Sequence, residues 1–281
     1  MKSRENRMSF VTEPRVALVG KPVLEIDGIM EFLDEHGYEW PELTEKLESM
    51  MSLGDDDGEW LVEFAGRMCY QSWPEQGETA KGRSHEEHIK HLIEVRHGAC
   101  IEHATFNFAM WNISRSLTHE LVRHRIASYS QLSQRYVDSS NVAFIVPPAI
   151  QELANTDPDA YRMWVEHCER SRQLYEELTG KLSAMYSDIE SGLERRKKAR
   201  QAARSVLPNA TETKIVVSMN ARAVRHLIEL RANPAADVEI RALAVKVCRI
   251  LQDKAPLFAH GLGIVKLEDG TEGVESTHRR V

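Results

Sequence analysis

The sequence predicts an α+β fold, with a central, mostly antiparallel sheet and long helices packed around it. Segments with helical spacing of apolar residues are long, whereas the β-branched or alternating segments are short. The two kinds of segment do not alternate regularly, as they would in a doubly wound parallel sheet. At 281 residues the chain has ample length for a buried core.

Composition and charge exclude several classes of protein. A hydrophobic content of 42% with 28% charged residues is ordinary for a globular protein. The net charge of −7 argues against a general nucleic-acid binder, which would be basic. The four cysteines are scattered and form no C-x-x-C pair, which argues against a zinc site or a disulfide framework. The apolar run at 16–19 is too short for a signal peptide or a membrane span, so we expect a cytoplasmic protein without membrane contact.

The first third of the chain is expected to contain a short strand followed by helical segments. The expected elements are a strand at 15–19, an acidic and weakly helical stretch at 25–51, a sharp turn at 54–58, a helix at 60–70 and a loop at 71–83. Ser84 and Glu87 then form the capping-box pattern S-x-x-E, which predicts a helix that runs to about residue 96.

The middle of the chain is expected to carry two strands and a short helix. Residues 103–111 alternate between apolar and polar, which predicts a half-buried strand. A helix at 114–122, a polar loop at 123–136 and a strand at 142–146 are expected to follow.

Most of the elements expected in the second half of the chain are helices. Asp157 as cap and Pro158 at the first helical position predict a helix that runs to about residue 178. A basic helix at 194–206 and a strand at 213–219 come next. Asn220 is expected to cap a helix that ends before Pro234. A last long helix at 238–251 precedes a tail that is expected to be loose from about residue 266.

The chemically most distinctive stretch is 123–136, where a helix end leads into a loop of hydroxyls and amides. It contains three arginines, one histidine, three serines and two glutamines. Guanidinium groups suit phosphate and carboxylate, so the stretch predicts an anion-binding site. A solvated basic turn is the alternative, but such a turn does not need the small polar residues Ser128, Ser130 and Ser133.

Two histidine-containing segments are further candidates. His85 and His88 lie three residues apart at a helix start, a spacing that suits a metal ion, although a solvated helix face is the favoured interpretation. In the turn 97–103, Glu102 and His103 either satisfy each other or bind a ligand.

The basic run 194–204 has two interpretations. Its residues 195–198 fit a solvated helix face, whereas a nucleic-acid stripe is disfavoured by the acidic net charge and by the lack of interleaved aromatic residues. Arg204 follows Ala202 and Ala203 on the less polar side, so we expect it to point inward.

The helix that begins at Asn220 presents arginine in two directions. Arg222 and His226 share one face, whereas Arg231 lies about half a revolution away. Salt bridges explain either arginine singly, and a shared site at a subunit boundary explains both.

Arg123-His124-Arg125, followed after seven residues by Ser133, resembles the RHR-x7-S signature of the flavin-dependent thymidylate synthases. The likeness extends from about residue 61 to about residue 256 and includes the segments 102–103, 201–204, 220–222 and 230–232. It implies one domain over 1–281, with a peripheral insertion at 20–58. It also implies a homotetramer with active sites shared between subunits.

The resemblance implies an FAD enzyme that methylates dUMP to dTMP with 5,10-methylenetetrahydrofolate and NADPH, in de novo dTMP biosynthesis. The residues that it assigns to dUMP are Glu120, Leu121, Val122, Arg123, Gln131, Leu132, Ser133, Gln134, Arg135, Arg204 and Arg231. Those that it assigns to FAD are His97, Ala99, Arg123, His124, Arg125, Gln131, Asn220, Ala221, Arg222 and His226.

Three positions have particular implications. The resemblance implies that Arg231 is the catalytic residue, because it matches the family's arginine that favours the ionised N3 of the uracil. Ala99 departs from the family pattern, which usually has Ser or Thr there. Ser133, between polar residues and beside arginine, is interpreted as a hydroxyl that binds the ligand and not as a nucleophile.

Two other classes of function remain open on the residues alone. A nucleic-acid-binding protein would use the helix 194–204, and a metal-dependent nucleotide hydrolase would use the histidines of 85–103. Neither accounts for the 123–136 stretch, and the resemblance favours small-molecule substrates, without nucleic acid and without a metal.

Overall fold

The computed structural model describes residues 10–49, 57–73 and 82–281, and it contains both helices and an antiparallel sheet, as the α+β prediction requires. Most of the turn expected at 54–58 and of the loop expected at 71–83 lies outside the described residues. The chain divides into two compact units. Unit 1 contains Met1–Arg15, Met110–Arg123 and Tyr129–Val216, and unit 2 contains Val16–Ala109, His124–Ser128 and Val217–Val281.

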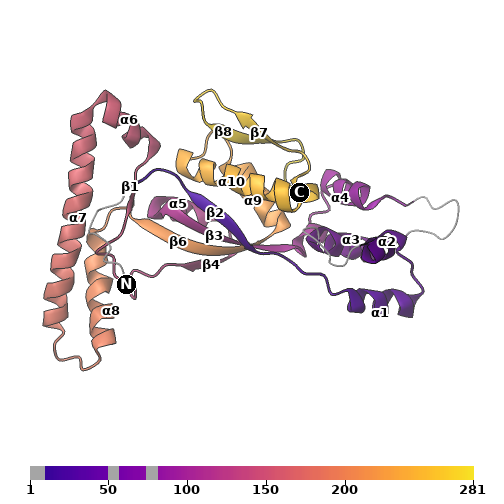
Figure 1. Cartoon of the computed structure of the whole chain (residues 1–281), viewed down its shortest axis with the longest axis horizontal. Helices are drawn as coiled ribbons and strands as arrows, with labels where there is room; N and C mark the ends of the chain where they lie inside the picture. Colours follow the sequence, from indigo (N-terminus) through magenta and orange to yellow (C-terminus); the bar gives the residue numbers. More distant parts are fainter. Residues whose placement is uncertain (1–9, 50–56, 74–81) are drawn as a thin grey trace. The chain divides into compact units, whose positions relative to one another are not determined.

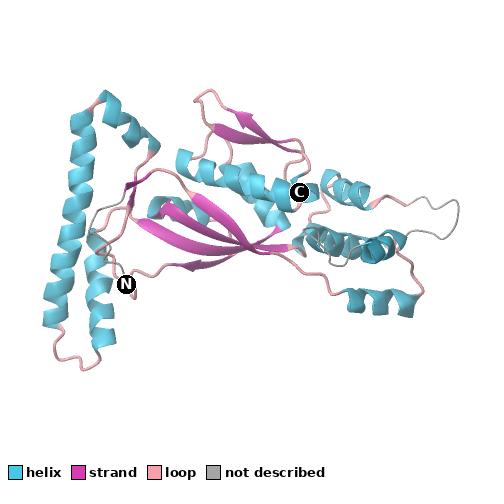
Figure 2. Ribbon diagram, in the orientation of Figure 1, coloured by secondary structure: helices cyan, strands magenta, loops and turns pink. Residues whose placement is uncertain are grey.

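A four-stranded sheet has the strand order β2-β3-β6-β4 and is drawn in magenta in Figure 2. Its strands are β2 (Arg15–Gly20), β3 (Thr105–Ser114), β6 (Glu212–Asn220) and β4 (Ser128–Gln131). The amide of Arg115 donates to the carbonyl of Thr211, and the amide of Ala221 donates to that of Ala104, so β3 and β6 run antiparallel. Phe106, the first apolar residue of the β3 alternation, is buried, as the sequence predicts.

Unit 1 contains the helices α5 (Arg115–Leu121), α6 (Pro148–Thr156), α7 (Pro158–Met185) and α8 (Gly192–Ala203), followed by the 3-10 turn η2 (Arg204–Val206). Helices α7 and α8 lie side by side (Figure 1). Asp157 caps α7 as predicted, with its Oδ1 accepting from the Ala160 amide at 3.1 Å. The helix is longer than expected, and α6 was not predicted at all.

Two short strands complete unit 1. β1 (Phe10–Val11) pairs in parallel with β5 (Phe144–Ile145), which covers only the centre of the strand expected at 142–146. The ring of Phe10 packs against Trp164 of α7 at 5.7 Å between centroids, so the strand pair is fixed to the long helix.

Unit 2 begins with β2 and four helices. These are α1 (Ile26–His36), α2 (Pro41–Ser49), α3 (Asp57–Tyr70) and α4 (His85–Glu94). Leu33, Trp40, Leu43 and Trp60 are buried in one apolar cluster that joins α1, α2 and α3. The stretch expected to be weakly helical therefore forms two helices that gain their stability from burial.

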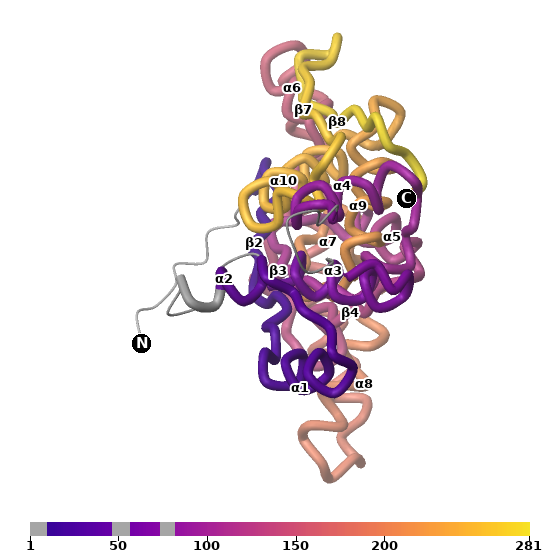
Figure 3. The backbone as a smooth tube through the Cα atoms, turned by 90° about the vertical axis from the view of Figure 1, so that its right-hand side faces the viewer, coloured from indigo at the N-terminus to yellow at the C-terminus, as the bar shows by residue number. Residues whose placement is uncertain are grey.

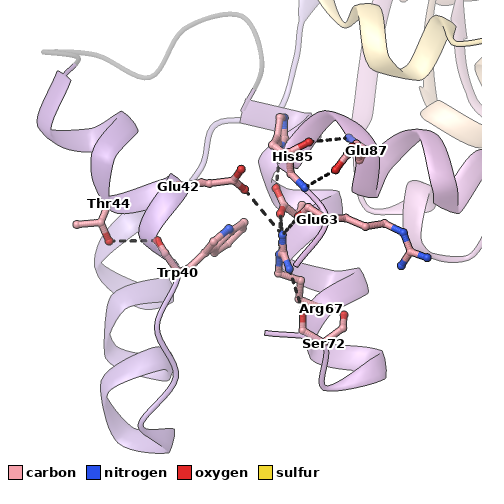
Figure 4. A network of polar contacts seen from close by, with 10 residues as sticks. Trp40, Glu42, Thr44, Glu63, Arg67, Ser72, His85 and Glu87 are labelled. Atoms are coloured by element: carbon pink, nitrogen blue, oxygen red, sulfur yellow. Dashed lines mark hydrogen bonds and ion pairs between the residues drawn. The ribbon is translucent and has the colours of Figure 1, made fainter. Parts of the chain in front are cut away.

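A polar network lies beside this cluster (Figure 4). Arg67 of α3 donates Nε–H to Glu63 at 2.6 Å, and its terminal nitrogens donate to the carbonyls of Ser72 and Arg83. Glu63 is fully buried and also accepts from Nδ1 of His85. Such a buried carboxylate is tolerated because both of its oxygens have cationic or hydrogen-bonding partners.

The capping box at the start of α4 is confirmed, since the Ser84 hydroxyl and the Glu87 carboxylate each bind the other residue's backbone amide. The expectation of a solvated face for the histidines that follow is wrong. His85 stacks on Trp60 at 3.8 Å, and His88 is buried. Burial and the charge of Arg67 lower the pKa of His88 to about 4.

Unit 2 also contains two helices, α9 (Ala221–Arg231) and α10 (Val238–Lys254). Their positions in the chain agree with the sequence prediction. The turn before β3 contains the 3-10 helix η1 (Cys100–Glu102), and η3 (Pro256–Ala259) follows α10. No helix within the described part of the chain is both long and apolar enough to cross a membrane.

Residues from about 266, expected to be loose, form instead half of an antiparallel hairpin. Its strands are β7 (Leu262–Lys266) and β8 (Glu272–Ser276), and the hairpin lies beside α10 (Figure 3). The amide of Val274 donates to the carbonyl of Ala232 at 2.9 Å, and Gly270 supplies the positive φ of the turn. Pairing with the adjacent strand β7 and the bond to Ala232 order this tail, which local composition does not reveal.

Candidate active site

The predicted polar loop begins at the end of α5 in unit 1 and contains a strand that was not predicted, β4. The amide of Arg123 donates to the carbonyl of Glu120, which continues the last turn of α5. The hydroxyl of Tyr129 donates to the carbonyl of Leu121 at 2.9 Å. The side-chain amide of Gln131 donates to the hydroxyls of Thr118 and Thr213, on α5 and β6. Hydrogen bonds therefore fix the loop to both elements.

A cavity of about 400 Å³ lies in unit 1 next to this loop. Its lining includes Leu132, Ser133, Gln134, Asp138, Glu212 and Lys214. The hydroxyl of Ser133 accepts from the amide of Arg135 at 3.3 Å. Burial raises the pKa of the Glu212 carboxyl, whereas Lys214 acts in the opposite direction. Three of the predicted dUMP residues thus line one polar cavity.

Arg115 is a candidate that sequence reasoning missed. Burial and the positive charge of the nearby Arg204 lower the pKa of the Arg115 guanidinium. Arg204 is half-buried, in agreement with the expectation that it points inward. Two neighbouring guanidinium groups repel each other, and an anionic ligand relieves that repulsion. No local pattern reveals this pair, because the two arginines are 89 positions apart in the sequence. They come together only through the fold.

The basic run of α8 is partly used inside unit 1. Arg200 donates to the carbonyl of Tyr136 at 2.8 Å and to the carboxylate of Asp138 at 3.0 Å. Lys197 lies over the ring of Tyr136 and forms an ion pair with Glu194. These contacts connect α8 to the polar loop, which weakens the interpretation as a nucleic-acid stripe.

In unit 2, His124 of the arginine-rich motif contacts two predicted site residues of α9. Arg231 donates Nε–H to Nε2 of His124 at 3.1 Å, and the rings of His124 and His226 lie edge to face at 5.6 Å. Burial, the charge of Arg231 and the nearby His226 lower the pKa of His124 to about 4. His124 is therefore a neutral imidazole that carries its proton on Nδ1 and accepts from Arg231 through Nε2.

Arg222, at the start of α9, has different partners. Its Nη1 donates to Glu102 of η1 at 2.6 Å, and its Nε donates to the carbonyl of Val281 at 2.8 Å. Glu102 is thus paired with Arg222 and not, as one alternative held, with His103. The different partners of Arg222 and Arg231 agree with the two directions that their spacing predicts.

The turn before η1 is packed closely against this arginine. A Cβ on Gly98 would lie 2.6 Å from Nε of Arg222 and 2.7 Å from the carbonyl carbon of Val281, so only glycine fits. His97 is exposed and stacks on Tyr70 at 5.1 Å, and Ala99 is exposed. The backbone here lies close to Arg222 without a side chain between them.

The N-terminus of α9 is capped as predicted. The Oδ1 atom of Asn220 accepts from the amide of Ala223 at 2.8 Å, and Ala221 is buried. Arg125 is exposed in the short segment that follows His124.

The predicted residues divide between the two units by ligand. Those assigned to dUMP lie in unit 1, except Arg231, and those assigned to FAD lie in unit 2, except Arg123 and Gln131. The division falls inside the arginine-rich motif, between Arg123 and His124. Each unit therefore contains its own set of the predicted arginines.

Guanidinium groups occur in both units, and a polar cavity lies in unit 1; these features suit anionic ligands. The family model of the thymidylate synthase complementing protein, Thy1, matches residues 48–257. The chain belongs to this family.

Relatives with high identity carry one name. A flavin-dependent thymidylate synthase of Mycobacterium avium (strain 104) is 49% identical over 221 residues, which cover 79% of this chain and 86% of that protein. A protein of the same name from Mycobacteroides abscessus is 48% identical, with the same coverage. A third, from Mycobacterium marinum, is 48% identical over 217 residues, 77% of this chain and 84% of that protein.

Proposed function

We propose that this chain is a flavin-dependent thymidylate synthase. It methylates dUMP to dTMP, taking the carbon from 5,10-methylenetetrahydrofolate and using FAD reduced by NADPH. The observation that carries the proposal is the match of residues 48–257 to the family model, which includes both partners of the hydrogen bond from Arg231 to His124. The relatives' printed name and their coverage of most of the chain support it.

The dUMP-binding residues that we propose lie at the end of α5, in the polar loop, in η2 and at the end of α9. They are Glu120, Leu121, Val122, Arg123, Gln131, Leu132, Ser133, Gln134, Arg135, Arg204 and Arg231. The polar lining of the unit 1 cavity supports this assignment for residues 132–134. The repulsion between Arg115 and Arg204 supports an anion, such as the phosphate, near that pair.

The residues proposed for FAD suit its chemistry. They are His97, Ala99, Arg123, His124, Arg125, Gln131, Asn220, Ala221, Arg222 and His226. The positive charge of Arg222 and the positive end of the α9 dipole suit the diphosphate, and Gly98 lets the backbone come close to that arginine. FAD, when bound and reduced by NADPH, supplies the hydride.

The protein's share in the reaction is charge and orientation. A fixed guanidinium stabilises the anionic uracil ring, whose C5 is the nucleophile toward the carbon derived from the folate. The hydrogen bond from Nε to His124 restricts the rotation of the Arg231 fork, and the neutral state of His124 adds no competing positive charge. Arg231 is thus the residue proposed for catalysis, and His124 is also a positioning residue for it.

We further infer that the enzyme is a homotetramer in which active sites are shared between subunits. The likeness to the flavin-dependent thymidylate synthases supports this arrangement. The whole chain forms one functional domain, and residues 20–58 are a peripheral insertion. The family match, which begins at residue 48, leaves most of that insertion outside.

The experiment that tests the function is oxidation of NADPH by the purified protein, followed with dUMP present or absent and with 5,10-methylenetetrahydrofolate present or absent. We expect dTMP to form only when FAD, dUMP and the folate are all present. Removing FAD should abolish dTMP formation, and adding FAD back should restore it. Equal dTMP formation by the flavin-free protein would show that the proposal is wrong.

A further inference from the structure

A cluster of three metal-ligating side chains lies in unit 2, outside every residue proposed for dUMP or FAD. Glu94 is the last residue of α4, His260 lies between η3 and β7, and His278 follows β8. Nε2 of His260 lies 3.2 Å from Oε1 of Glu94, and the ligand atoms of all three residues lie within 4.8 Å of one another. Among the described residues, it is the one group in which three or more such ligands lie together.

A buried arginine fixes the backbone of both histidines. Arg225 of α9 is 1% exposed, and its Nη1 donates to the carbonyls of Phe258 and His260, at 2.6 and 2.9 Å. Its Nη2 donates to the carbonyl of His278 at 3.2 Å. One side chain thus holds together two histidines that are 18 positions apart in the sequence.

The open end of the hairpin brings the two imidazoles together. The amide of Thr277 donates to the carbonyl of Gly261 at 2.9 Å, directly beside both histidines. Gly261 has φ +75°, and a Cβ there would lie 2.6 Å from Cδ2 of His278. The glycine therefore leaves room for the His278 ring, which stacks on that of His260 with centroids 5.0 Å apart.

Two imidazole nitrogens and a carboxylate oxygen are the ligands that zinc uses in sites that keep a position for water. Ligand atoms around a tetrahedral zinc ion lie about 3.3 Å apart, given metal–ligand bonds of about 2.0–2.2 Å. The ligand atoms of Glu94 and His260 already lie at about this distance from each other. Rotation of the His278 side chain brings its ring nitrogen into place as the third ligand. Both histidines are half-buried and Glu94 is exposed, so the cluster is accessible from solvent.

We propose that Glu94, His260 and His278 bind one divalent transition-metal ion, with Zn²⁺ as the ion whose ligand preference they match. Water completes the coordination. The ion connects α4 to the two ends of the β7–β8 hairpin, since His260 precedes β7 and His278 follows β8. It also fixes the segment after β8, whose last residue accepts a hydrogen bond from Arg222.

The test is calorimetric titration of Zn²⁺ into the full chain without an affinity tag, after dialysis against a chelator. We expect one ion per chain. Glu94→Gln and His278→Ala should each weaken the affinity at least tenfold, because each removes one of three protein ligands. Two controls should leave it unchanged: His167→Ala, at an exposed histidine of α7, and Cys69→Ser, at the exposed thiol.

A second measurement follows the hairpin itself, first in the wild type. Hydrogen exchange of residues 272–281 should become slower when Zn²⁺ is added to the wild type, and should not respond to it in Glu94→Gln. Binding that survives in Glu94→Gln and His278→Ala, or that disappears in Cys69→Ser, would overturn the proposal. So would an unchanged exchange rate of the hairpin in the wild type at saturating Zn²⁺.

Discussion

His124 shows how burial sets the chemistry of a single residue. The residue lies between two arginines in the sequence, is only 6% exposed and faces the guanidinium of Arg231. Desolvation and a neighbouring cation both favour the neutral form. The motif is visible in the sequence, whereas the protonation state follows only from the packing around it.

The low pKa of His124 makes the stability of the protein depend on pH. In the unfolded chain this histidine has a pKa of about 6.5, against about 4 in the folded protein. Between these values only the unfolded state gains the proton, so the free energy of unfolding falls as the pH is lowered from about 6.5 to about 4. The loss from one such histidine is ~3 kcal/mol at most.

Urea unfolding at several pH values between these limits measures the effect. His124→Gln should make the dependence on pH shallower, because the residue that takes up the proton is removed. His167→Gln, at an exposed histidine, is the control and should keep the slope of the wild type. Identical slopes for His124→Gln and the wild type would contradict the assignment of a neutral His124.

Arg231 is predicted to act on the chemical step. Because its Nε donates to His124, lysine cannot reproduce the oriented fork, although it keeps the charge. Arg231→Ala and Arg231→Lys should both lower kcat by ~100-fold or more, the effect expected when a preorganised donor is lost. FAD should remain bound in both variants.

Single-turnover oxidation of the reduced flavin, at saturating dUMP and 5,10-methylenetetrahydrofolate, separates this effect from binding. Lys246→Ala, on α10, serves as a control for the loss of a cation from unit 2. A wild-type rate in Arg231→Ala would mean that this arginine only binds dUMP.

At the scale of elements, local capping signals predicted where two helices begin, whereas α6 was not predicted. The S-x-x-E pattern at Ser84 and the Asp-Pro pair at 157–158 each begin a helix in the structure, because side-chain oxygens satisfy the first backbone amides. The strand β4 was missed because its partner β6 is distant in sequence, and β8 was missed although its partner β7 is adjacent. The pair formed by Arg115 and Arg204 and the burial of His88 were missed because they depend on residues from other parts of the chain.

The cap of α7 allows a direct test of such a local signal. Asp157→Ala removes the acceptor for the amide of Ala160, and should lower the free energy of unfolding by ~1 kcal/mol. Asp159→Ala removes an exposed carboxylate two residues further on, which pairs with Arg162 at 2.8 Å. That change should stay within about 0.5 kcal/mol. Equal midpoints for the two variants in urea would show that the cap contributes nothing.

At the scale of the whole molecule, the chain separates the two sets of predicted ligand-binding residues. Most dUMP positions belong to unit 1 and most FAD positions to unit 2. The identity of these residues could be predicted from motifs in the sequence. Their hydrogen bonds, burial and protonation could not, because they depend on residues from other parts of the chain.

Sharing of active sites between subunits predicts complementation. One inactive variant is altered at the flavin position Arg222 (Arg222→Ala), and the other at the dUMP position Arg204 (Arg204→Ala). Mixing them, with exchange of subunits, should restore part of the activity, because some sites then receive both intact residues. Sedimentation should find a tetramer. A monomer with full activity would rule out this arrangement.

The most direct test of the central claim is the identity of the folate product. If the hydride comes from the flavin, the folate gives up only its one-carbon unit, and each dTMP formed should be accompanied by one tetrahydrofolate and one oxidised NADPH. The products of a reaction with limiting dUMP can be separated by chromatography and identified by mass. Tetrahydrofolate in equal amount to dTMP is the predicted result, and dihydrofolate as the product would contradict the account.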